Sequence, residues 1–473
     1  MYNKFQEDKN GQLELLDTVL SEAGAFLSRR EDDTVYPIFP QKEAMRVSDE
    51  GLGARGALDY FLKNYAPYVS LNTGPRFYGF VVGGVTPAAL AGDWLTSLYD
   101  QNAFGTAGHL DRHIEMEAVS GLIDLLGLHS DMTGSFTSGA TMATAAALAV
   151  AREWAAQSQG KTANDGVYGL ERPVILSGTA HPSVYKGLSI LGLGRNSLTV
   201  VDALEGREAV DVKKLEQALA QNSGKPCIVI ANMGTANSGD VDDLKSIAAL
   251  KEKYDFYLHV DGAIGIVAAA SDQYRPLFEG ILLADSITID CHKWLNVPYD
   301  SAIALVRKEH KEYQYRTYAQ EAAVKSTVSE ETDYTNLGNE GSRRFRALAV
   351  WMSLMAYGKK GYAEMVERDC AMARLFAEKL ESSGILRLMG PVRLNGFAFT
   401  FNKDHVSDEE ILALRQKIRL DGAAFLNHSK VCGVPVLRCS LSNWAIQEKD
   451  VEAVAASVIR CATEMQNQKE AAK

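Results

Sequence analysis

The sequence predicts an α/β fold whose large central domain is built on a mostly parallel β-sheet. Short apolar runs recur through the middle of the 473-residue chain, and runs this apolar are typical of strands that are buried on both faces. Helical stretches separate the runs, as the crossover connections between parallel strands require. We expect strands at 174–177, 227–231, 257–260, 286–289 and 302–306.

Three regions follow one another along the chain. Residues 1–70 mix helical patterning with a proline-containing connection, and we expect them to form an N-terminal arm. Residues 71–346 contain the expected strands and form the large domain. Residues 347–473 begin with a long helix and continue as a smaller α+β unit. Ligands of open parallel sheets bind beyond the carboxyl ends of the strands, so candidate site residues are sought there.

The composition excludes several classes of protein. Hydrophobic residues make up 46% and charged residues 23% of the chain, which is ordinary for a soluble globular protein. The net charge of −11 argues against nucleic acid and anionic membranes as partners. The apolar stretch at 262–270 is too short to span a bilayer, and the polar start of the chain shows no secretory signal. Six cysteines without a CxxC pair favour reduced thiols, so we expect a cytoplasmic protein.

Lys293 is the most informative single residue. It lies between two expected strands, in a mostly apolar connection, with His292 and Trp294 beside it. Lysine is rarely buried without a partner, and a desolvated lysine has a lowered pKa and can form a Schiff base with a carbonyl group. The alternative is a lysine that reaches the surface from a turn.

Other polar groups follow neighbouring strands. Asp261 comes directly after one apolar run, where a carboxylate is either a ligand group or a turn former. His181 follows another run, where a histidine is either functional or a hydrogen-bonded structural residue. The loop 232–244 is rich in glycine, hydroxyl and amide groups. We expect these side chains to share one edge of the sheet with Lys293.

A small-residue turn, TSGATMATAAALAVAREW (137–154), leads into an alanine-rich helix. Thr137, Ser138 and Thr141 are natural N-cap types, and Gly139 allows close approach of the backbone to a ligand. A helix N-terminus of this kind binds anions, most often phosphate, although many helices begin this way without a ligand. Together with a lysine, an acid and a histidine, it forms the set that an aldehyde cofactor with a phosphate and a basic ring nitrogen needs.

With these residues in place, the chain resembles the group II pyridoxal-phosphate-dependent decarboxylases, the family that contains aromatic amino-acid and glutamate decarboxylases. The motifs that carry the resemblance are PRFYGF (75–80), ALAGDWLTS (89–97), SGATMA, TAHPSVYKG, GTANSGDVD, HVDGA, DCHKW, SRRFRALAVW (342–351) and LRCSLSN (437–443). The resemblance implies the type I fold of pyridoxal-phosphate-dependent transferases, with pyridoxal 5'-phosphate as cofactor. It also implies a homodimer in which the N-terminal arms take part and the active sites are shared.

The resemblance implies catalytic roles for three residues. Lys293 resembles the lysine that carries the cofactor, Asp261 the partner of the ring nitrogen, and His181 the imidazole that stacks on the ring. Further cofactor contacts are implied for the small residue on the other face of the ring, for the phosphate cradle, for the histidine beside the phosphate and for a loop threonine. These residues are Ala263, Ser138, Gly139, Ala140, Thr141, His292 and Thr235.

Two positions depart from the family pattern. Many relatives carry asparagine where this chain has Asp290, and an ionised aspartate cannot donate a hydrogen bond to a phosphate, so we give Asp290 no such role. Aromatic-type members carry a proton-donating tyrosine on a loop whose place here falls near Ala323 or Val324. Tyr318 and Tyr334 are nearby, but the proton donor stays open.

The expected activity is decarboxylation of an L-amino acid to an amine and CO₂. In the family a neighbouring subunit completes the pocket, and here the residues expected to do so are Phe77, Tyr78, Phe80 and Phe104. Aromatic residues suit an aromatic or medium apolar substrate, although they can equally be interface core. Alternatives are an acidic substrate such as glutamate, oxidative deamination to an aldehyde, C–C bond cleavage, or cofactor binding without catalysis.

A possible metal site is rejected. His109, His113 and Glu117 have the i, i+4, i+8 spacing of one helix face, which could suggest metal ligands. No cysteine or second histidine cluster accompanies them. We therefore favour a helix face or subunit contact and expect no metal.

Overall fold

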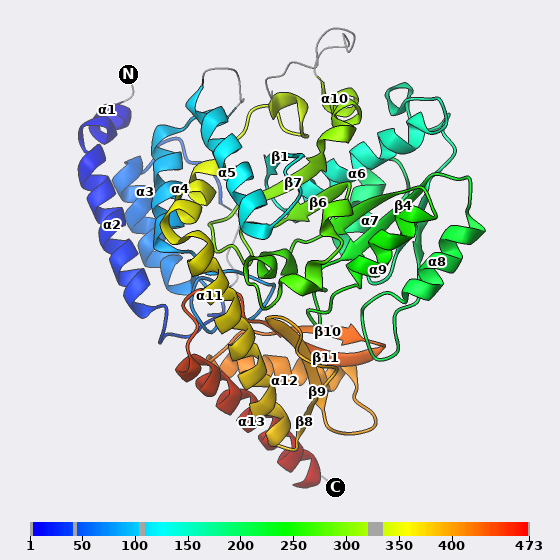
Figure 1. Ribbon diagram of the computed structural model, residues 1–473. Coiled ribbons are helices and arrows are strands. Elements are labelled where there is room, and N and C mark those ends of the chain that lie inside the picture. The colour runs from blue at the N-terminus through cyan, green and yellow to red at the C-terminus, as the bar shows by residue number, and fades with distance from the viewer. Residues whose placement is uncertain (1–2, 41–44, 104–108, 320–333, 472–473) are drawn as a thin grey trace.

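A seven-stranded sheet forms the centre of the molecule (Figure 1). The computed structural model describes residues 3–40, 45–103, 109–319 and 334–471. Along the sheet the strands lie in the order β1-β7-β6-β5-β4-β2-β3. Their bounds are β1 Met132–Thr137, β2 Val174–Ser177, β3 Leu198–Val200, β4 Cys227–Asn232, β5 Phe256–Asp261, β6 Ser286–Ile289 and β7 Ala302–Arg307.

The sheet is mostly parallel, which confirms the expectation from the sequence. Strands β2 to β6 pair in parallel, whereas β7 is antiparallel to both of its neighbours, β1 and β6. All five expected strands are present. Strands β1 and β3 were not expected, because β1 reads MTGSFT without an apolar run and β3 is a three-residue edge strand. Strand β1 is nevertheless fully buried, because α5 and β7 cover it.

Helices cover both faces of this sheet. Side chains alternate between the faces of a strand, and on β4 Ile228 and Ile230 pack with α6 and α7, whereas Val229 and Ala231 enter the larger core beneath α5, α8 and α9. The helices of this part of the chain are α4 Pro87–Tyr99, α5 Leu110–Leu126, α6 Ala140–Gln157, α7 Pro182–Ile190, α8 Val212–Gln221, α9 Leu244–Ala249 and α10 Lys311–Tyr318.

A second core lies around a smaller, antiparallel sheet of order β10-β11-β9-β8. The long helix α11 joins the two cores, since its Val366 packs in the larger one and its Phe376 in the smaller one. The remaining elements are α11 Ala347–Ser382, β8 Leu386–Leu388, β9 Gly396–Phe401, α12 Asp408–Asp421, β10 Asn427–Val431, β11 Val434–Ser440 and α13 Glu448–Ala471.

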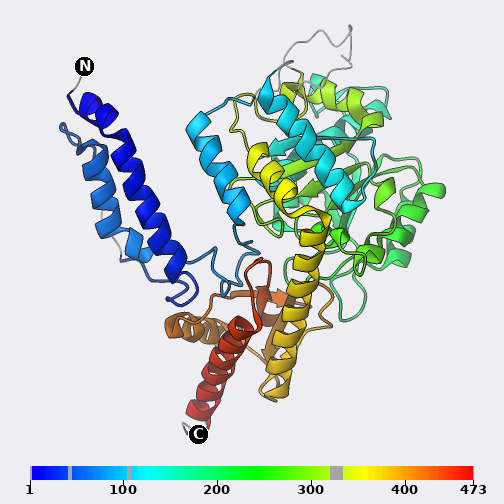
Figure 2. The same cartoon turned by 60° about the vertical axis from the view of Figure 1, so that its left-hand side comes forward.

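The N-terminal helices stand apart from the body of the chain (Figure 2). They are α1 Asn3–Asn10, α2 Gln12–Arg29 and α3 Gly53–Asn64. None of the three buries a residue, and apolar side chains such as Leu13 and Leu20 are 78% and 59% exposed. In the described part of the chain, no helix is both long and apolar enough to cross a membrane. All six cysteines are free thiols, and Cys432 is the exposed one.

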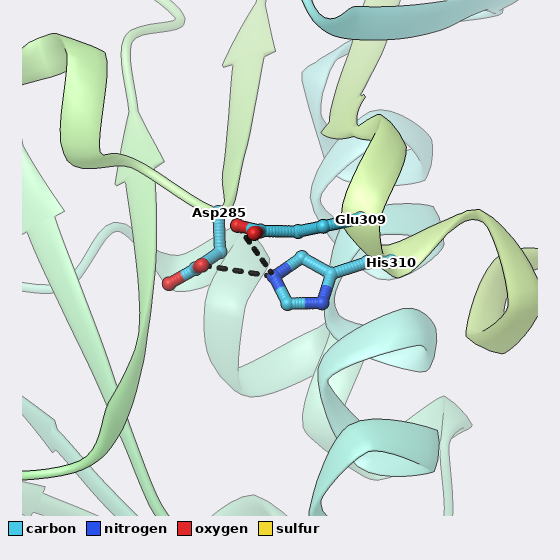
Figure 3. A group of neighbouring side chains, drawn as sticks. All are labelled: Asp285, Glu309 and His310. Carbon is cyan, nitrogen blue, oxygen red and sulfur yellow. Dashed lines mark hydrogen bonds and ion pairs between the residues drawn. The ribbon is translucent and has the colours of Figure 1, made fainter.

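A buried charge cluster ties β6 to its neighbours at the edge opposite the strand ends that carry Asp261 and Lys293 (Figure 3). Asp285 accepts hydrogen bonds from Lys251 Nζ at 2.5 Å and from the backbone N–H of Leu258 at 2.6 Å, and it bonds His310 Nε2 at 2.8 Å. Asp285, His310 and Glu309 form the one set of possible metal ligands within the described residues. Because the Lys251 ammonium already balances Asp285, we interpret the cluster as structural.

Two of the residues with helical spacing at 109–117 lie at α5. Glu117 accepts a hydrogen bond from Trp351 Nε1 at 2.6 Å, which joins α5 to α11. His109 lies at the N-cap of α5 and is exposed. Glu117 therefore belongs to a contact between two helices.

The Asp285 cluster predicts a pH-dependent contribution to stability. Burial raises the pKa of Asp285, but the His310 hydrogen bond and the Lys251 charge outweigh it and hold this pKa below its ordinary value. A depressed carboxyl pKa stabilises the fold above the unfolded value of about 3.9 and is lost as the pH falls through the folded value. We expect Asp285→Asn to lower the free energy of unfolding by about 1.5–3 kcal/mol at pH 7. Urea unfolding should show this difference shrinking below about pH 4, and a constant difference would contradict the ionic role.

Candidate active site

A cavity of about 250 Å³ opens where β2, β4 and β5 end. The carboxyl ends of parallel strands meet at this edge, as expected for a ligand site in an α/β sheet. Three of the residues predicted to be catalytic line it together: Lys293, Asp261 and His181. The other lining residues are Ala140, Thr179, Ala180, Pro182, Ser183, Asn232, Gly234, Thr235, Ala236, Asn237, Ala263, Ile264, His428, Ser429 and Arg438.

Packing on three sides fixes the turn that carries Lys293. Trp294 is fully buried, and its Nε1 donates to Asp369 on α11 at 2.8 Å. Asn296 donates to the carbonyl of Ser442 at 2.9 Å and accepts from the backbone N–H of Trp444 at 3.0 Å, which ties the turn to the smaller unit. On the third side the backbone of Gly83 lies so close that a β-carbon there would overlap the carbonyl oxygen of Lys293.

Asp261 and His181 lie on different elements around the cavity. Asp261 ends β5, is 8% exposed and accepts a hydrogen bond from the backbone N–H of Ala263 at 3.2 Å. His181 is the N-cap of α7, where its Nδ1 accepts from the backbone N–H of Ser183 at 3.2 Å. Partial burial lowers the pKa of His181. The negative charge of Asp261 acts in the opposite direction but is the smaller effect, so a neutral ring is favoured at pH 7.

The N-terminus of α6 begins at the cavity. Ala140 is its first residue and lines the cavity, and Gly139 is its N-cap. The backbone N–H groups of Met142 and Ala143 donate to the carbonyl of Gly139 at 2.9 and 3.0 Å, whereas the N–H groups of Ala140 and Thr141 come too early in the helix to have an acceptor within it. Two donors are thus available for an anion. Ser138, Gly139 and Thr141 lie at the same helix start without lining the cavity.

Thr235 lines the cavity, but its hydroxyl has another partner. It donates to Glu208 at 2.6 Å, and Glu208 also accepts from Asn237 Nδ2 at 2.8 Å and from Ser238 Oγ at 2.6 Å. The carboxylate is 5% exposed. Glu208 therefore holds the loop after β4 in place, and Thr235 reaches the cavity as part of that loop.

His292 does not line the cavity, and both of its ring nitrogens are engaged. The backbone N–H of Ser301 donates to Nδ1 at 3.2 Å, and Nε2 lies 3.0 Å from Asp290 Oδ1. The ring also stacks on Tyr299 with 4.0 Å between the centroids. A β-carbon on Gly139 would lie 3.4 Å from His292 Cε1. The atom of His292 nearest to Gly139, at the start of α6, is therefore the ring carbon Cε1. Both ring nitrogens contact other groups.

The smaller unit contributes side chains that sequence reasoning missed. Arg438 on β11 lies opposite Asn427 in the ladder, and Ser429 lies opposite Val436, so Ser429 and Arg438 point to the same face of the sheet. Both line the cavity, and Arg438 Nη1 donates to the carbonyl of Ala236 at 2.9 Å. The motif LRCSLSN contains Arg438, but nothing in its pattern shows that β11 packs against this edge of the larger sheet.

Of the aromatic residues expected in the substrate pocket, the three that the structure describes do not line the cavity. Phe77 and Tyr78 are 3% and 1% exposed, because Phe77 packs on Phe425 and Tyr78 packs in the smaller core. Phe80 is 53% exposed, and its backbone N–H donates to Asn427 at 2.6 Å. Phe104 lies outside the described residues.

The expected place of the loop tyrosine, near Ala323 or Val324, also lies outside the described residues. The two nearby tyrosines contact other parts of the protein. The Tyr318 hydroxyl donates to the carbonyl of Ala146 at 2.8 Å, and Tyr334 is 3% exposed beside Arg343. Neither tyrosine lines the cavity.

The residues present fit pyridoxal phosphate. Its aldehyde needs an amine, which Lys293 supplies, and its ring nitrogen needs an acid, which Asp261 supplies. Its phosphate needs N–H donors, which the start of α6 supplies through Ala140 and Thr141. The flat ring needs neutral surfaces, and the neutral imidazole of His181 and the methyl group of Ala263 provide them.

The close packing of Gly83 on Lys293 gives a direct test of how the turn is held. In Gly83→Ala the new methyl group must displace the Lys293 carbonyl, and we expect pyridoxal phosphate to bind at least about tenfold more weakly, a change of about 1.4 kcal/mol. Titration of the visible absorbance of the bound cofactor measures this. Gly169→Ala is the control, since a β-carbon there meets no atom within 4 Å. Equal affinity of the two variants would contradict the packing argument.

Comparison with known proteins finds relatives along most of the chain. Residues 55–401 match the family model described as the pyridoxal-dependent decarboxylase conserved domain. The aromatic-L-amino-acid decarboxylase of Bacillus atrophaeus is 28% identical over 90% of this chain and 90% of its own length. The L-2,4-diaminobutyrate decarboxylase of Acinetobacter baumannii is 28% identical over 73% of this chain and 71% of its own length.

The fold has close counterparts among solved structures. The crystal structure of Oryza sativa TDC with PLP and tryptamine superposes with a TM-score of 0.86 at 22% identity, over 96% of this chain and 98% of that chain. The expected type I fold of pyridoxal-phosphate-dependent enzymes is thereby confirmed. The family match covers most of the sequence and the site holds the groups that the cofactor needs. The chain therefore belongs to the pyridoxal-dependent decarboxylase family and is a pyridoxal-phosphate-dependent amino-acid carboxy-lyase.

Proposed function

We propose that this protein converts an L-amino acid with an aromatic or medium apolar side chain into the corresponding amine and CO₂. The observation that carries the proposal is the meeting of Lys293, Asp261, His181 and the start of α6 around one cavity. When bound there, pyridoxal phosphate supplies a ring that accepts the electron pair of the bond being broken.

Each residue of the site has a separate task in this proposal. Lys293 would hold the cofactor at its aldehyde carbon through the side-chain amine. The carboxylate of Asp261 would keep the proton on the ring nitrogen, because a close negative charge favours the protonated form. His181 would provide an apolar ring surface, and Ala140 and Thr141 would hold the phosphate through their N–H groups.

Two exposed aromatic residues contact segments that carry cavity-lining residues, and they support the apolar substrate class. Phe80 is bonded through its backbone to Asn427, two residues before the cavity-lining Ser429. Tyr299 is 55% exposed and stacks on His292. Surfaces of this kind favour a substrate that brings an apolar or aromatic group.

Arg438 supports a second candidate, an acidic amino acid such as glutamate. Its guanidinium is a fixed positive charge in the cavity, and planar guanidinium groups recognise carboxylates. An α-carboxylate held tightly in an ion pair resists leaving as uncharged CO₂, because such binding stabilises the ground state more than the transition state. Arg438 therefore suits a carboxylate on the substrate side chain.

We also propose a homodimer in which the N-terminal helices bind a second copy. Phe5, Leu13 and Leu20 are 67%, 78% and 59% exposed on helices that bury none of their own residues. Exposed apolar side chains on helices that bury none of their own residues are typical of an interaction surface. The free thiols support our expectation of a cytoplasmic setting.

A panel of L-amino acids tests the reaction and its substrate. We expect CO₂ and amine in equal amounts with aromatic or apolar substrates, and neither product from Lys293→Ala. Aldehyde with peroxide would indicate oxidative deamination, aldehyde without CO₂ a C–C lyase, and cofactor binding without any product a non-catalytic protein. Arg438→Met should reduce kcat/KM about 10- to 100-fold for glutamate alone if the substrate is acidic, since a charge-assisted bond is lost.

Sedimentation analysis tests the dimer. We expect wild-type protein to sediment as a dimer and the Leu13→Asp, Leu20→Asp double variant as a monomer, because two buried carboxylates would oppose the helix contact. Tyr168→Asp replaces an exposed apolar residue elsewhere and should remain dimeric. A dimeric double variant would rule out the α2 surface as the interface.

A further inference from the structure

Asp290 is a carboxylate inside the catalytic lysine turn that no role yet explains. Its Oδ2 lies 3.2 Å from Lys293 Nζ, and its side chain is 3% exposed. It follows β6 directly, three residues before the lysine. The backbone N–H of Lys293 also donates to the carbonyl of Asp290 at 3.2 Å. Both the side chain and the backbone of Asp290 therefore bind the same lysine.

His292 lies against the other oxygen of Asp290. Since Nδ1 accepts the backbone N–H of Ser301, the ring proton is on Nε2, which faces Asp290 Oδ1 at 3.0 Å. Stacking on Tyr299 fixes the plane of the ring. The imidazole cannot turn toward another partner without losing both contacts. One oxygen of Asp290 thus lies beside His292 Nε2, and the other faces the lysine amine.

The carboxylate is held in its charged form. Burial raises the pKa of Asp290, but the charge of Lys293 and the hydrogen bond from His292 outweigh burial and lower this pKa below its ordinary value. The other charged or titratable groups that line the cavity with this amine are Asp261 on β5, His181 at the start of α7, His428 on β10 and Arg438 on β11. Asp290 is the acid whose contact with Nζ, at 3.2 Å, lies within the distance of an ion pair.

We propose that Asp290 is a positioning residue that keeps the nitrogen of Lys293 positively charged and sets the pH at which this amine becomes reactive. A buried amine without a partner would lose its proton readily, whereas the Asp290 carboxylate stabilises the ammonium form. The His292–Asp290 pair thus acts on the nitrogen of Lys293 and takes no part in binding the phosphate. This inference rests on the proposed role of Lys293 as the amine that binds the cofactor.

Competitive labelling of the cofactor-free protein with acetic anhydride tests the proposal. The rate at Lys293, read by mass spectrometry of its peptide, is followed against pH. A nearby opposite charge moves a titration midpoint by about 1–3, so we expect the midpoint to fall by that amount in Asp290→Asn. At pH 7.5 the variant should react at least about tenfold faster than wild type. An unchanged midpoint would overturn the proposal and leave Asp290 as a structural residue.

Asp285→Asn is the matched control. It removes another buried carboxylate that binds a lysine, five residues earlier and at the other end of β6, and its partner is Lys251. We expect the labelling midpoint of Lys293 to be unchanged in this variant, so a general loss of stability is separated from the local effect. The same fall in both variants would count against a specific role of Asp290.

A second variant keeps the proposal testable if Asp290→Asn does not fold. Asp290→Glu keeps the charge, so its labelling midpoint should equal that of the wild type, and a lower midpoint would contradict the ionic role. These readings need no substrate, so their failure is distinct from a failure of the proposed decarboxylation.

Discussion

The pairing of a buried lysine ammonium with a buried carboxylate is the constraint around which this structure is arranged. Lys293 and Asp290 are 15% and 3% exposed, and neither charge is stable there alone. The pair is possible because β7 runs antiparallel to β6, so the connection between them stays at one edge of the sheet. Trp294, Asn296 and Gly83 then lock the turn against α11, the C-terminal segment and an earlier loop.

The site is shared between two hydrophobic cores. The larger sheet supplies the acid, the lysine and the loop that Glu208 holds, whereas the smaller sheet supplies Ser429 and Arg438. Helix α11 packs in both cores, and Asp369 on that helix accepts the hydrogen bond from Trp294. A shift of one core relative to the other would therefore change the position of Arg438 relative to the Lys293 turn.

The sequence predicts the parts of this molecule that rest on local pattern. Apolar runs predicted the five central strands, and polar residues at strand ends predicted the meeting of Lys293, Asp261 and His181. Strand β1 could not be predicted, because its Thr, Gly and Ser residues are buried by neighbours distant in the chain. Arg438 was missed because its place depends on how the smaller sheet docks. Thr235 contacts Glu208, and His292 contacts Asp290. These contacts depend on the tertiary structure and cannot be predicted from the spacing of residues along the sequence.

Cys432 is the one exposed thiol among the six cysteines, and this exposure has a practical consequence. It lies at the tip of the β10–β11 hairpin, and its Sγ is 3.9 Å from the carbonyl oxygen of Arg207 in the larger unit. The other five thiols are buried and protected from reagents. A fluorophore or spin label added to the unmodified protein would therefore attach at a single point on the seam between the two units. Its spectrum would report when that seam opens, without any engineered cysteine.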